Sequence, residues 1–579
     1  MLKSVGGQVP GWKDSVVPQI SRSEPRIAPA TVAVPDTADL PDARQWLTLA
    51  VVLAAPLMAI FDQFVVNVAI PTMQRDLHAS FGAIQFVIAG YALAYAVLLI
   101  TGGRLGDIFG RKRLFLIGMT GFTLASALCG LAPTPTALIG FRVLQGAAAA
   151  MMSPQVLAII QVTFTEKDRA KAFGAYGAVL GVSGVLGQVL GGLLIQADVW
   201  GLGWRTVFLV NVPVGLIAVP TAFVLLAEAR APLARRLDIG GVLIVSASVL
   251  ALAYPLVAGR DAGWPPWTWP CLAASVPLLY VFVCFERAQA TRGGSPLVDL
   301  TLFGDRAFRI GLVVLLIYGA TSAGYFLILA LHLQIGLHFS PLAAGATFVP
   351  DAVAFFIAAS WSSRLVPRLG VRLLNIGFAL KCIGLTAVIL TARHLGPTLH
   401  GQDLAPALFV QGFGSGFISA PLIGFILAGT RNANVGSASG VLTTVQQIAG
   451  AIGVAVIGIL FFGLLAGGAD SVAARATPAV QAHLGSAIPD TAVADTVTDF
   501  RACVHDRAAA RDPAVAPASC ARPDLAPAEP VARTALADDV NTAMANIYTN
   551  AFTTALACIV GALAVAFGVI FLLPTKRAA

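Results

Sequence analysis

The feature that most constrains this chain is a series of about 14 apolar segments, each long enough to cross a bilayer as a helix. Hydrophobic residues make up 57% of the sequence and charged residues 11%, too few to cover the surface of a water-soluble protein of 579 residues. The sequence therefore predicts an all-α membrane protein. The apolar segments begin near Leu47, Ile84, Leu114, Leu138, Phe173, Thr206, Gly240, Cys271, Ile310, Ala346, Leu373, Leu404, Val441 and Phe552.

Lysine and arginine are distributed unevenly among the loops that join these segments. They gather in the N-terminal tail and in alternate loops, while the short loops between carry about one or none each. This asymmetry predicts a multi-pass protein of the cell membrane with both termini in the cytoplasm, and it argues against nucleic acid as the partner of the net charge of +8. The cation-rich loops hold Arg104, Arg111, Lys112, Arg113, Lys167, Arg169, Lys171, Arg230, Arg235, Arg236, Arg287, Arg292, Arg306, Arg309, Arg364, Arg368 and Arg372.

The polar segment from Gly102 to Arg113 lies between two apolar runs and carries four cations and one aspartate. Such a segment predicts a cytoplasmic hairpin between two membrane helices. It resembles the signature loop of the major facilitator superfamily, Gly-x-x-x-Asp-x-x-Gly-Arg-Lys/Arg, with Ile108 where that family has arginine. The resemblance implies a cytoplasmic gate formed by Gly103, Asp107, Gly110, Arg111, Lys112 and Arg113.

Asp62 lies in the middle of the first apolar segment, where a carboxylate costs roughly 2.5–3.5 kcal/mol to insert. The run from Asp62 to Pro71 resembles the Asp-x-x-x-Val-Asn-x-Ala-x-Pro signature of the 14-helix drug:proton antiporters. The resemblance implies a role in proton coupling for Asp62. The alternative is that Asp62 only forms structural hydrogen bonds, with Asn67 or with a neighbouring helix.

Arg142, Gln145 and Gly146 resemble the Arg-x-x-Gln-Gly signature of the fourth helix in the same superfamily. Because arginine keeps its proton, Arg142 is expected to act as a fixed counter-charge for a coupling carboxylate. The alternative is that its side chain reaches toward the membrane surface or donates hydrogen bonds to backbone carbonyls. Candidates for lining a substrate cavity are Asn67, Tyr91, Gln145 and Gln188, and the alternative for Tyr91 is that it only anchors an interface.

A glycine-rich helix follows, and Gly187, Gly191 and Gly192 are expected to let it pack closely against a neighbour. The run from Gly187 to Gly192 resembles the Gly-Pro-x-x-Gly-Gly signature associated with exporters, with Gln188 in place of proline. This substitution restores a backbone donor and leaves an importer or facilitator as the alternative to an exporter.

The run from Trp204 to Gly215 matches the Trp-Arg-x-x-Phe-x-x-Asn-x-Pro-x-Gly pattern of the 14-helix family in full. That resemblance implies two six-helix bundles plus two extra helices. The expected parts are a disordered cytoplasmic tail at 1–44, the first bundle at 45–230, the extra pair at 231–290, five helices of the second bundle at 291–465, a long extracytoplasmic loop at 466–548, and the last helix with a cytoplasmic C-terminus at 549–579.

The second half contains three ionisable residues in apolar surroundings, namely Asp351, Lys381 and His332. Asp351 is a candidate for a second proton-coupling carboxylate. Its alternative is a carboxylate at the start of a helix, which the helix dipole favours. Snorkelling is the alternative for Lys381, and an interface position is the alternative for His332.

Cys503 and Cys520 lie in the segment that is expected outside the membrane, where disulfides persist. They are candidates for a disulfide, and two free thiols are the alternative. The other five cysteines lie in apolar segments, where a small hydrophobic role is expected.

No Walker loop, nucleophile elbow or cluster of metal ligands is visible in the sequence, so we expect neither an enzyme nor a cofactor or metal. The resemblances imply a monomeric drug:proton antiporter that exports amphipathic or cationic molecules such as antibiotics by alternating access. Its expected partners are a small-molecule substrate, protons and the lipid bilayer. A non-transporting membrane scaffold or receptor is the alternative from another class.

Overall fold

The computed structural model describes residues 42–79, 81–228, 238–259, 263–292, 297–428, 430, 435–485, 490–510, 517–520 and 530–572. Residues 1–41 of the expected tail lie outside this part. The described helices belong to one compact unit. Thirteen of them are long and apolar enough to cross a membrane, or 14 if the bent helix at 168–197 counts as one span, and the described residues contain no strand. The predicted all-α membrane fold is confirmed.

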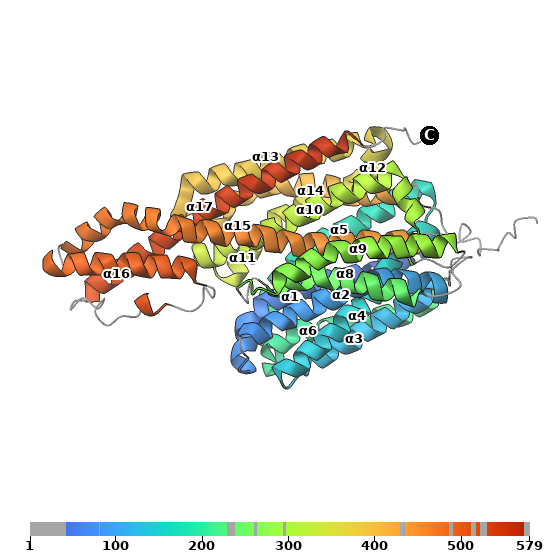
Figure 1. The fold of residues 1–579 in the computed structure, drawn as a ribbon, viewed down its shortest axis with the longest axis horizontal. Coiled ribbons are helices and arrows are strands. Elements are labelled where there is room, and N and C mark those ends of the chain that lie inside the picture. Colours follow the sequence, from blue (N-terminus) through green and yellow to red (C-terminus); the bar gives the residue numbers. More distant parts are fainter. Residues whose placement is uncertain are drawn as a thin grey trace, which may run out of the picture. The chain divides into compact units, whose positions relative to one another are not determined.

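The helices follow one another along the chain as Figure 1 shows. The first group is α1 (Asp42–Asp76), α2 (Phe81–Phe109), α3 (Arg111–Gly130), α4 (Pro135–Thr163), α5 (Glu166–Ala197), α6 (Thr206–Leu209) and α7 (Asn211–Leu225), followed by α8 (Ile239–Ala258) and α9 (Thr268–Thr291). The second group is α10 (Arg306–Leu331), α11 (Pro341–Thr347), α12 (Val349–Leu369), α13 (Arg372–Leu395), α14 (Ala405–Leu427), α15 (Val435–Gly485), α16 (Asp490–Ala509) and α17 (Pro530–Ile570). Short 3-10 turns connect several of these helices, and a π-helical turn, His332–Gly336, ends α10.

The packing of the helices repeats between the two groups. Helices α2 and α3 both pack on α4, and α12 and α13 both pack on α14. Likewise α1 packs on α5 as α10 packs on α15, and α3 packs on α7 as α13 packs on α17. The two groups are therefore two bundles with one internal design, joined where α5 meets α12 and α14 and where α15 meets α2 and α4.

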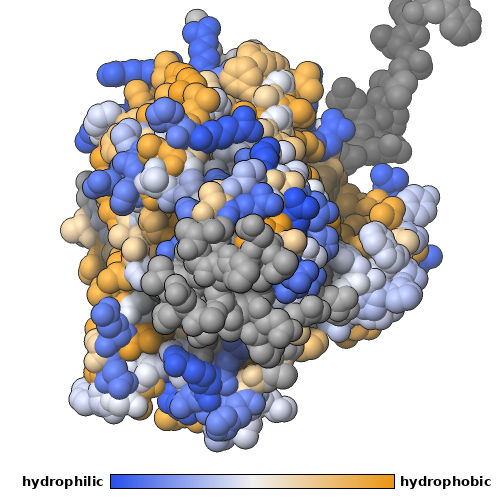
Figure 2. Space-filling model, turned by 90° about the vertical axis from the view of Figure 1, so that its left-hand side faces the viewer, coloured by the Kyte–Doolittle hydropathy of each residue, from blue (hydrophilic) through white to orange (hydrophobic). Residues whose placement is uncertain are grey.

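The surface agrees with a membrane environment. Large apolar side chains such as Ile117 and Leu124 on α3, and Val276 on α9, are exposed on the outside of the bundles. Figure 2, seen from the end at which α16 lies, shows hydrophilic residues over that end and hydrophobic residues along the flank. Apolar flanks with polar ends are what a bilayer requires.

Most described residues of the segment at 466–548, which is expected as a long loop, are helical. Helix α15 continues to Gly485, α16 runs antiparallel beside it, and α17 begins at Pro530 (Figure 1). The segment is rich in alanine, a strong helix former, and Val497, Phe500 and Val504 are buried at helical spacing. A disulfide joins Cys503 to Cys520 in this three-helix region.

The hairpin expected between Gly102 and Arg113 is also much tighter than a loop. Helix α2 continues through Gly103 and Asp107 to Phe109, and α3 begins at Arg111. The break is Gly110 alone, whose φ of 110° is a conformation that favours glycine.

Candidate functional site

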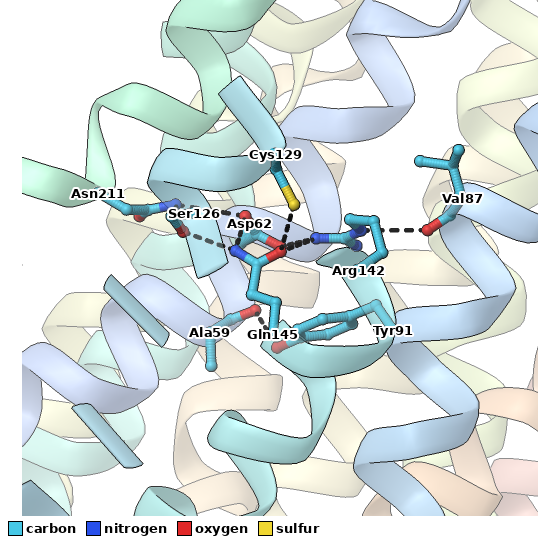
Figure 3. Close-up of polar contacts among 9 residues, drawn as sticks. All are labelled: Ala59, Asp62, Val87, Tyr91, Ser126, Cys129, Arg142, Gln145 and Asn211. Atoms are coloured by element: carbon cyan, nitrogen blue, oxygen red, sulfur yellow. Dashed lines mark hydrogen bonds and ion pairs between the residues drawn. The ribbon is translucent and has the colours of Figure 1, made fainter. Parts of the chain in front are cut away.

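Asp62 lies in α1 and is fully buried within the first bundle. Its carboxylate forms an ion pair with the guanidinium of Arg142 from α4 and accepts hydrogen bonds from two amides (Figure 3). Gln145 Nε2 donates to Asp62 Oδ1 over 2.9 Å, and Asn211 Nδ2 donates to the same oxygen over 3.2 Å. The carboxylate therefore has both a counter-charge and neutral donors around it.

The other donors of this cluster are also bound. Arg142 Nε donates to the backbone oxygen of Val87 over 3.1 Å, and Arg142 Nη1 donates to Gln145 Oε1 over 2.7 Å. The guanidinium lies 4.3 Å from the centre of the Tyr91 ring. Arg142 is 1% exposed, so the side chain does not reach for the membrane surface. Gln145 Nε2 also donates to Ser126 Oγ over 2.7 Å, which closes the network (Figure 3).

Glycines bring the helices of this network together. A Cβ on Gly146 would lie 2.3 Å from the backbone oxygen of Tyr91, so α4 crosses α2 in direct contact at this point. Gly187 and Gly191 of α5 pack in the same way on residues Phe61–Val65 of α1, whereas Gly192 has only Leu342 nearby, at 4.0 Å. The glycine face expected on α5 thus packs mainly against the helix that carries Asp62.

A cavity of about 160 Å3 lies between the two bundles, and Asp62 is not among its lining residues. Helices α1 and α5 line it from the first bundle, and α10, α12, α13 and α14 line it from the second. Its lining residues are Phe64, Leu180, Gly181, Gly184, Tyr318, Ser322, Phe326, Asp351, Ala352, Phe355, Lys381, Gln411, Ser415 and Ser419.

Tyr91 and Gln145, which are candidates for lining a substrate cavity, form hydrogen bonds inside the first bundle in this conformation. Tyr91 donates its hydroxyl to the backbone oxygen of Ala59 over 3.2 Å, and both polar groups of Gln145 are bound inside the first bundle. Neither side chain is among those that line the cavity. The side chains of Asn67 and Gln188 lie outside the described residues.

The charged residues that line the cavity are Asp351 and Lys381. Gln411 of α14 stands between them, since Gln411 Nε2 donates to Asp351 Oδ1 over 3.1 Å and Lys381 Nζ donates to Gln411 Oε1 over 3.3 Å. Lys381 Nζ also donates to Ser415 Oγ over 2.8 Å. The Lys381 side chain is therefore bonded inside the protein and does not reach for the membrane surface. Asp351, in the first turn of α12, also accepts a hydrogen bond from Gln411 and lines the cavity.

The segment expected to form a gate lies at one end of the bundles. Asp107 and Arg111 are buried and paired over 3.3 Å, and Arg113 pairs with Glu228 over 3.5 Å. A Cβ on Gly110 would lie 2.2 Å from Glu228 Oε1, so this glycine also makes room for the Glu228 carboxylate. Gly103 is buried in α2, and the ammonium of Lys112 lies 5.1 Å from the centre of the Phe223 ring.

Trp204 and Arg205 of the 204–215 motif both bind Asp76, the last residue of α1. Trp204 Nε1 donates to Asp76 Oδ2 over 2.8 Å, and Arg205 pairs with the same oxygen. The hydrogen bonds from Arg205 and then from Trp204 lower the pKa of the Asp76 carboxyl from its ordinary value. This contact ties the end of α1 to the segment before α6.

Gln411, Ser415 and Asn211 were not predicted as site residues, although Asn211 is the asparagine of the 204–215 motif. A signal was present for Gln411, because Gln411-Gly412 precedes Pro421 much as Gln145-Gly146 precedes Pro154. The geometry agrees, since a Cβ on Gly412 would lie 2.1 Å from the backbone oxygen of Asp351, as Gly146 meets Tyr91. In the repeat, Gln411 of the second bundle is equivalent to Gln145 of the first, and Asp351 is equivalent to Tyr91.

Comparison with known proteins agrees with this arrangement. Residues 52–454 match the family model described as Major Facilitator Superfamily. A crystal structure of the human organic anion transporter MFSD10 (TETRAN) has a similar fold, with a TM-score of 0.52 and 15% identity over 73% of this chain and 94% of that one.

Several proteins of similar sequence come from Streptomyces. The chain is 38% identical to a probable actinorhodin transporter of Streptomyces coelicolor, over 95% of this chain and 96% of that protein. It is 36% identical to the puromycin resistance protein pur8 of Streptomyces alboniger, over 74% and 84% of the two chains. It is 32% identical to the tetracenomycin C resistance and export protein of Streptomyces glaucescens, over 72% and 76%.

Proposed function

Since the chain belongs to the major facilitator superfamily, we propose that it exports amphipathic or cationic small molecules such as antibiotics in exchange for protons, by alternating access. Proteins of similar sequence are named for antibiotic resistance and export. The cavity supports the proposal because both bundles line it. At about 160 Å3 it is smaller than the roughly 300–1,000 Å3 of a drug-sized site, so cargo would bind in a wider conformation.

The single observation that carries proton coupling is the burial of Asp62 in its ion pair with Arg142. A proton on Asp62 would remove the charge that holds Arg142, and the contact between α1 and α4 would weaken. Phe64, two residues further along α1, lines the cavity, so a shift of α1 would change the cavity wall. In this scheme Arg142 is the fixed counter-charge of Asp62, and Asp351 is the carboxylate at the cargo.

Protons provide enough energy for such an exchange. One charge that moves through 100 mV releases roughly 2.3 kcal/mol, which corresponds to a concentration ratio of tens. The gate would be the buried pair of Asp107 and Arg111 with Gly103, Gly110, Lys112 and Arg113, at the cytoplasmic end of the bundles. We further propose that both termini are cytoplasmic, that the protein acts as a monomer in the cell membrane without cofactor, metal or nucleic acid, and that it is not an enzyme.

Dye efflux from cells tests this function. Cells that express the protein should lose a loaded fluorescent dye, and the efflux should stop when the proton gradient is collapsed and in the Asp62→Asn variant. Asp168→Asn is the matched control, because Asp168 lies in a partly exposed surface pair with Lys171. Full efflux in Asp62→Asn cells with a collapsed gradient would reject proton coupling. Proton flux in the same direction as cargo would instead indicate an importer.

A further inference from the structure

The cavity is lined by the cation Lys381 and the carboxylate Asp351, which differ in how many of their possible hydrogen bonds are formed. Lys381 Nζ has three donors and gives two of them to Gln411 and Ser415, while its charge lies 5.3 Å from the centre of the Tyr318 ring and 5.9 Å from that of Tyr325. Among the described residues, the hydrogen bond to Asp351 comes from Gln411 alone, although a carboxylate can accept about four. The carboxylate therefore has more unused hydrogen-bonding capacity at the cavity than the ammonium has.

The cavity wall also favours positive charge. Phe64, Phe326, Phe355 and Tyr318 surround the space beside Asp351, and the faces of aromatic rings attract cations. A carboxylate near aromatic side chains is the usual chemistry for recognising an organic ammonium group. In the structure, the ammonium of Lys381 already occupies surroundings of this kind.

We propose that the cavity is a site for an aromatic organic cation and that Lys381 is an internal competitor, which supplies the positive charge near Asp351 while the site is empty. This inference rests on the proposed export function and names its cargo class. The Gln411 amide lies between the two charges and lets Lys381 neutralise Asp351 without direct contact. A cationic cargo molecule would neutralise the charge of Asp351 in place of Lys381.

The proposed class is consistent with exchange against protons. A cation and a proton compete for the same carboxylate, so binding of one releases the other. An anion at Lys381 would do the opposite, because it would draw a proton to Asp351 and travel with it. The charged and polar groups at the cavity with Asp351 are Lys381 of α13, the tyrosines and Ser322 of α10, and Gln411, Ser415 and Ser419 of α14. Helices α1 and α5 present Phe64, Leu180 and glycines.

Binding of two dyes with one ring system and opposite charge tests the proposal. Rhodamine 123 is a cation and fluorescein is an anion, and both carry a xanthene frame. Fluorescence polarisation at pH 8 would measure their binding to the full-length protein in detergent, for wild type, Lys381→Met, Lys381→Arg and Asp351→Asn. Lys171→Met is the matched control, because it removes an exposed lysine of α5. Thermal melting of each variant verifies folding.

Removal of the competitor should strengthen cation binding. We expect Lys381→Met to bind rhodamine 123 about tenfold more tightly than wild type, Lys381→Arg and Lys171→Met to resemble wild type, and Asp351→Asn to lose at least tenfold. Loss of fluorescein binding in Lys381→Met with unchanged rhodamine binding would overturn the proposal in favour of an anion site. Binding of neither dye to folded protein would also overturn it.

This measurement is separate from the export function. Tight rhodamine binding that depends on Asp351, together with no dye flux in reconstituted vesicles, would reject export and leave the cation site standing. Proton-driven flux of a different dye without rhodamine binding would reject the cation site and leave export standing.

Discussion

Gln145 and Gln411 occupy equivalent positions in the two bundles, and each donates its side-chain amide to a buried carboxylate. Gln145 Nε2 lies 2.9 Å from Asp62 Oδ1, and Gln411 Nε2 lies 3.1 Å from Asp351 Oδ1. Both also accept a hydrogen bond from a buried cation, Arg142 in one bundle and Lys381 in the other. The two halves thus contain related polar clusters, of which only the second reaches the cavity.

The glycine after each glutamine should tolerate no side chain. A Cβ on Gly146 or Gly412 would lie 2.3 Å or 2.1 Å from a backbone oxygen of the facing helix. We expect Gly146→Ala and Gly412→Ala each to lower the free energy of unfolding by about 1–3 kcal/mol, because the helices must separate. Thermal melting in detergent measures this. Gly140→Ala and Gly424→Ala on the same helices meet no atom within 4 Å and should leave the melting temperature within about a degree of wild type.

The ion pair of Asp62 and Arg142 should show strong coupling between its partners. Arg142→Met leaves a buried carboxylate without its counter-charge and should destabilise the protein by about 3–5 kcal/mol. Adding Asp62→Asn to Arg142→Met removes the unpaired charge and should recover most of that loss. Thermal melting of wild type, Asp62→Asn, Arg142→Met and the double variant gives the four values of a double-mutant cycle. A double variant that is less stable than Arg142→Met would contradict the structural account of this cluster.

The disulfide between Cys503 and Cys520 should stabilise the three-helix region locally. It closes a loop of 17 residues, for which chain entropy gives about 3 kcal/mol. We expect Cys503→Ser/Cys520→Ser to increase protease cleavage around α16 while dye efflux continues, since the cavity lies elsewhere. Limited proteolysis followed by mass spectrometry measures this. Equal cleavage of variant and wild type would show that the disulfide does not hold α16.

The contact between Asp76 and Arg205 should depend on pH. Because the pKa of Asp76 is lowered in the folded state, its contribution is present above the ordinary aspartate value of about 4 and is lost as pH falls through the lowered pKa. Asp76→Asn should therefore be less stable than wild type at pH 7, and the difference should shrink toward pH 3. The effect should be small, because the Asp76 side chain is half exposed.

The fold was largely predictable from the sequence, because a bilayer leaves few choices. Apolar runs of spanning length must be helices, and the motifs around Asp62, Gly110 and Trp204 identify their order. The region at 466–548 was not predictable in the same way. Its alanine-rich composition is compatible with both a loop and a helix, and the burial of Phe500 and Val504 depends on contacts with α15 and α17.

The polar cluster of the first bundle was predictable from motifs, whereas in the second bundle Asp351 and Lys381 were candidates and Gln411 was not. Asp62, Arg142 and Gln145 stand in recognisable motifs, and the structure brings all three together. The position of the cavity could not be read from them, because it depends on how the two bundles meet. Lys381 and Gln411 lie 30 residues apart on different helices. Their contact depends on Gly384 of α13, which packs on the backbone of Gln411, and on Gly414 of α14, which packs on the backbone of Lys381.

Proton movement during transport tests the central claim most directly. Purified protein reconstituted into vesicles with an internal pH dye would be given rhodamine 123 from outside. Exchange predicts that protons leave the vesicles as the dye enters, and that Asp62→Asn abolishes this proton movement. Dye entry in the wild type without any proton movement, or with protons moving inward alongside the dye, would contradict the account.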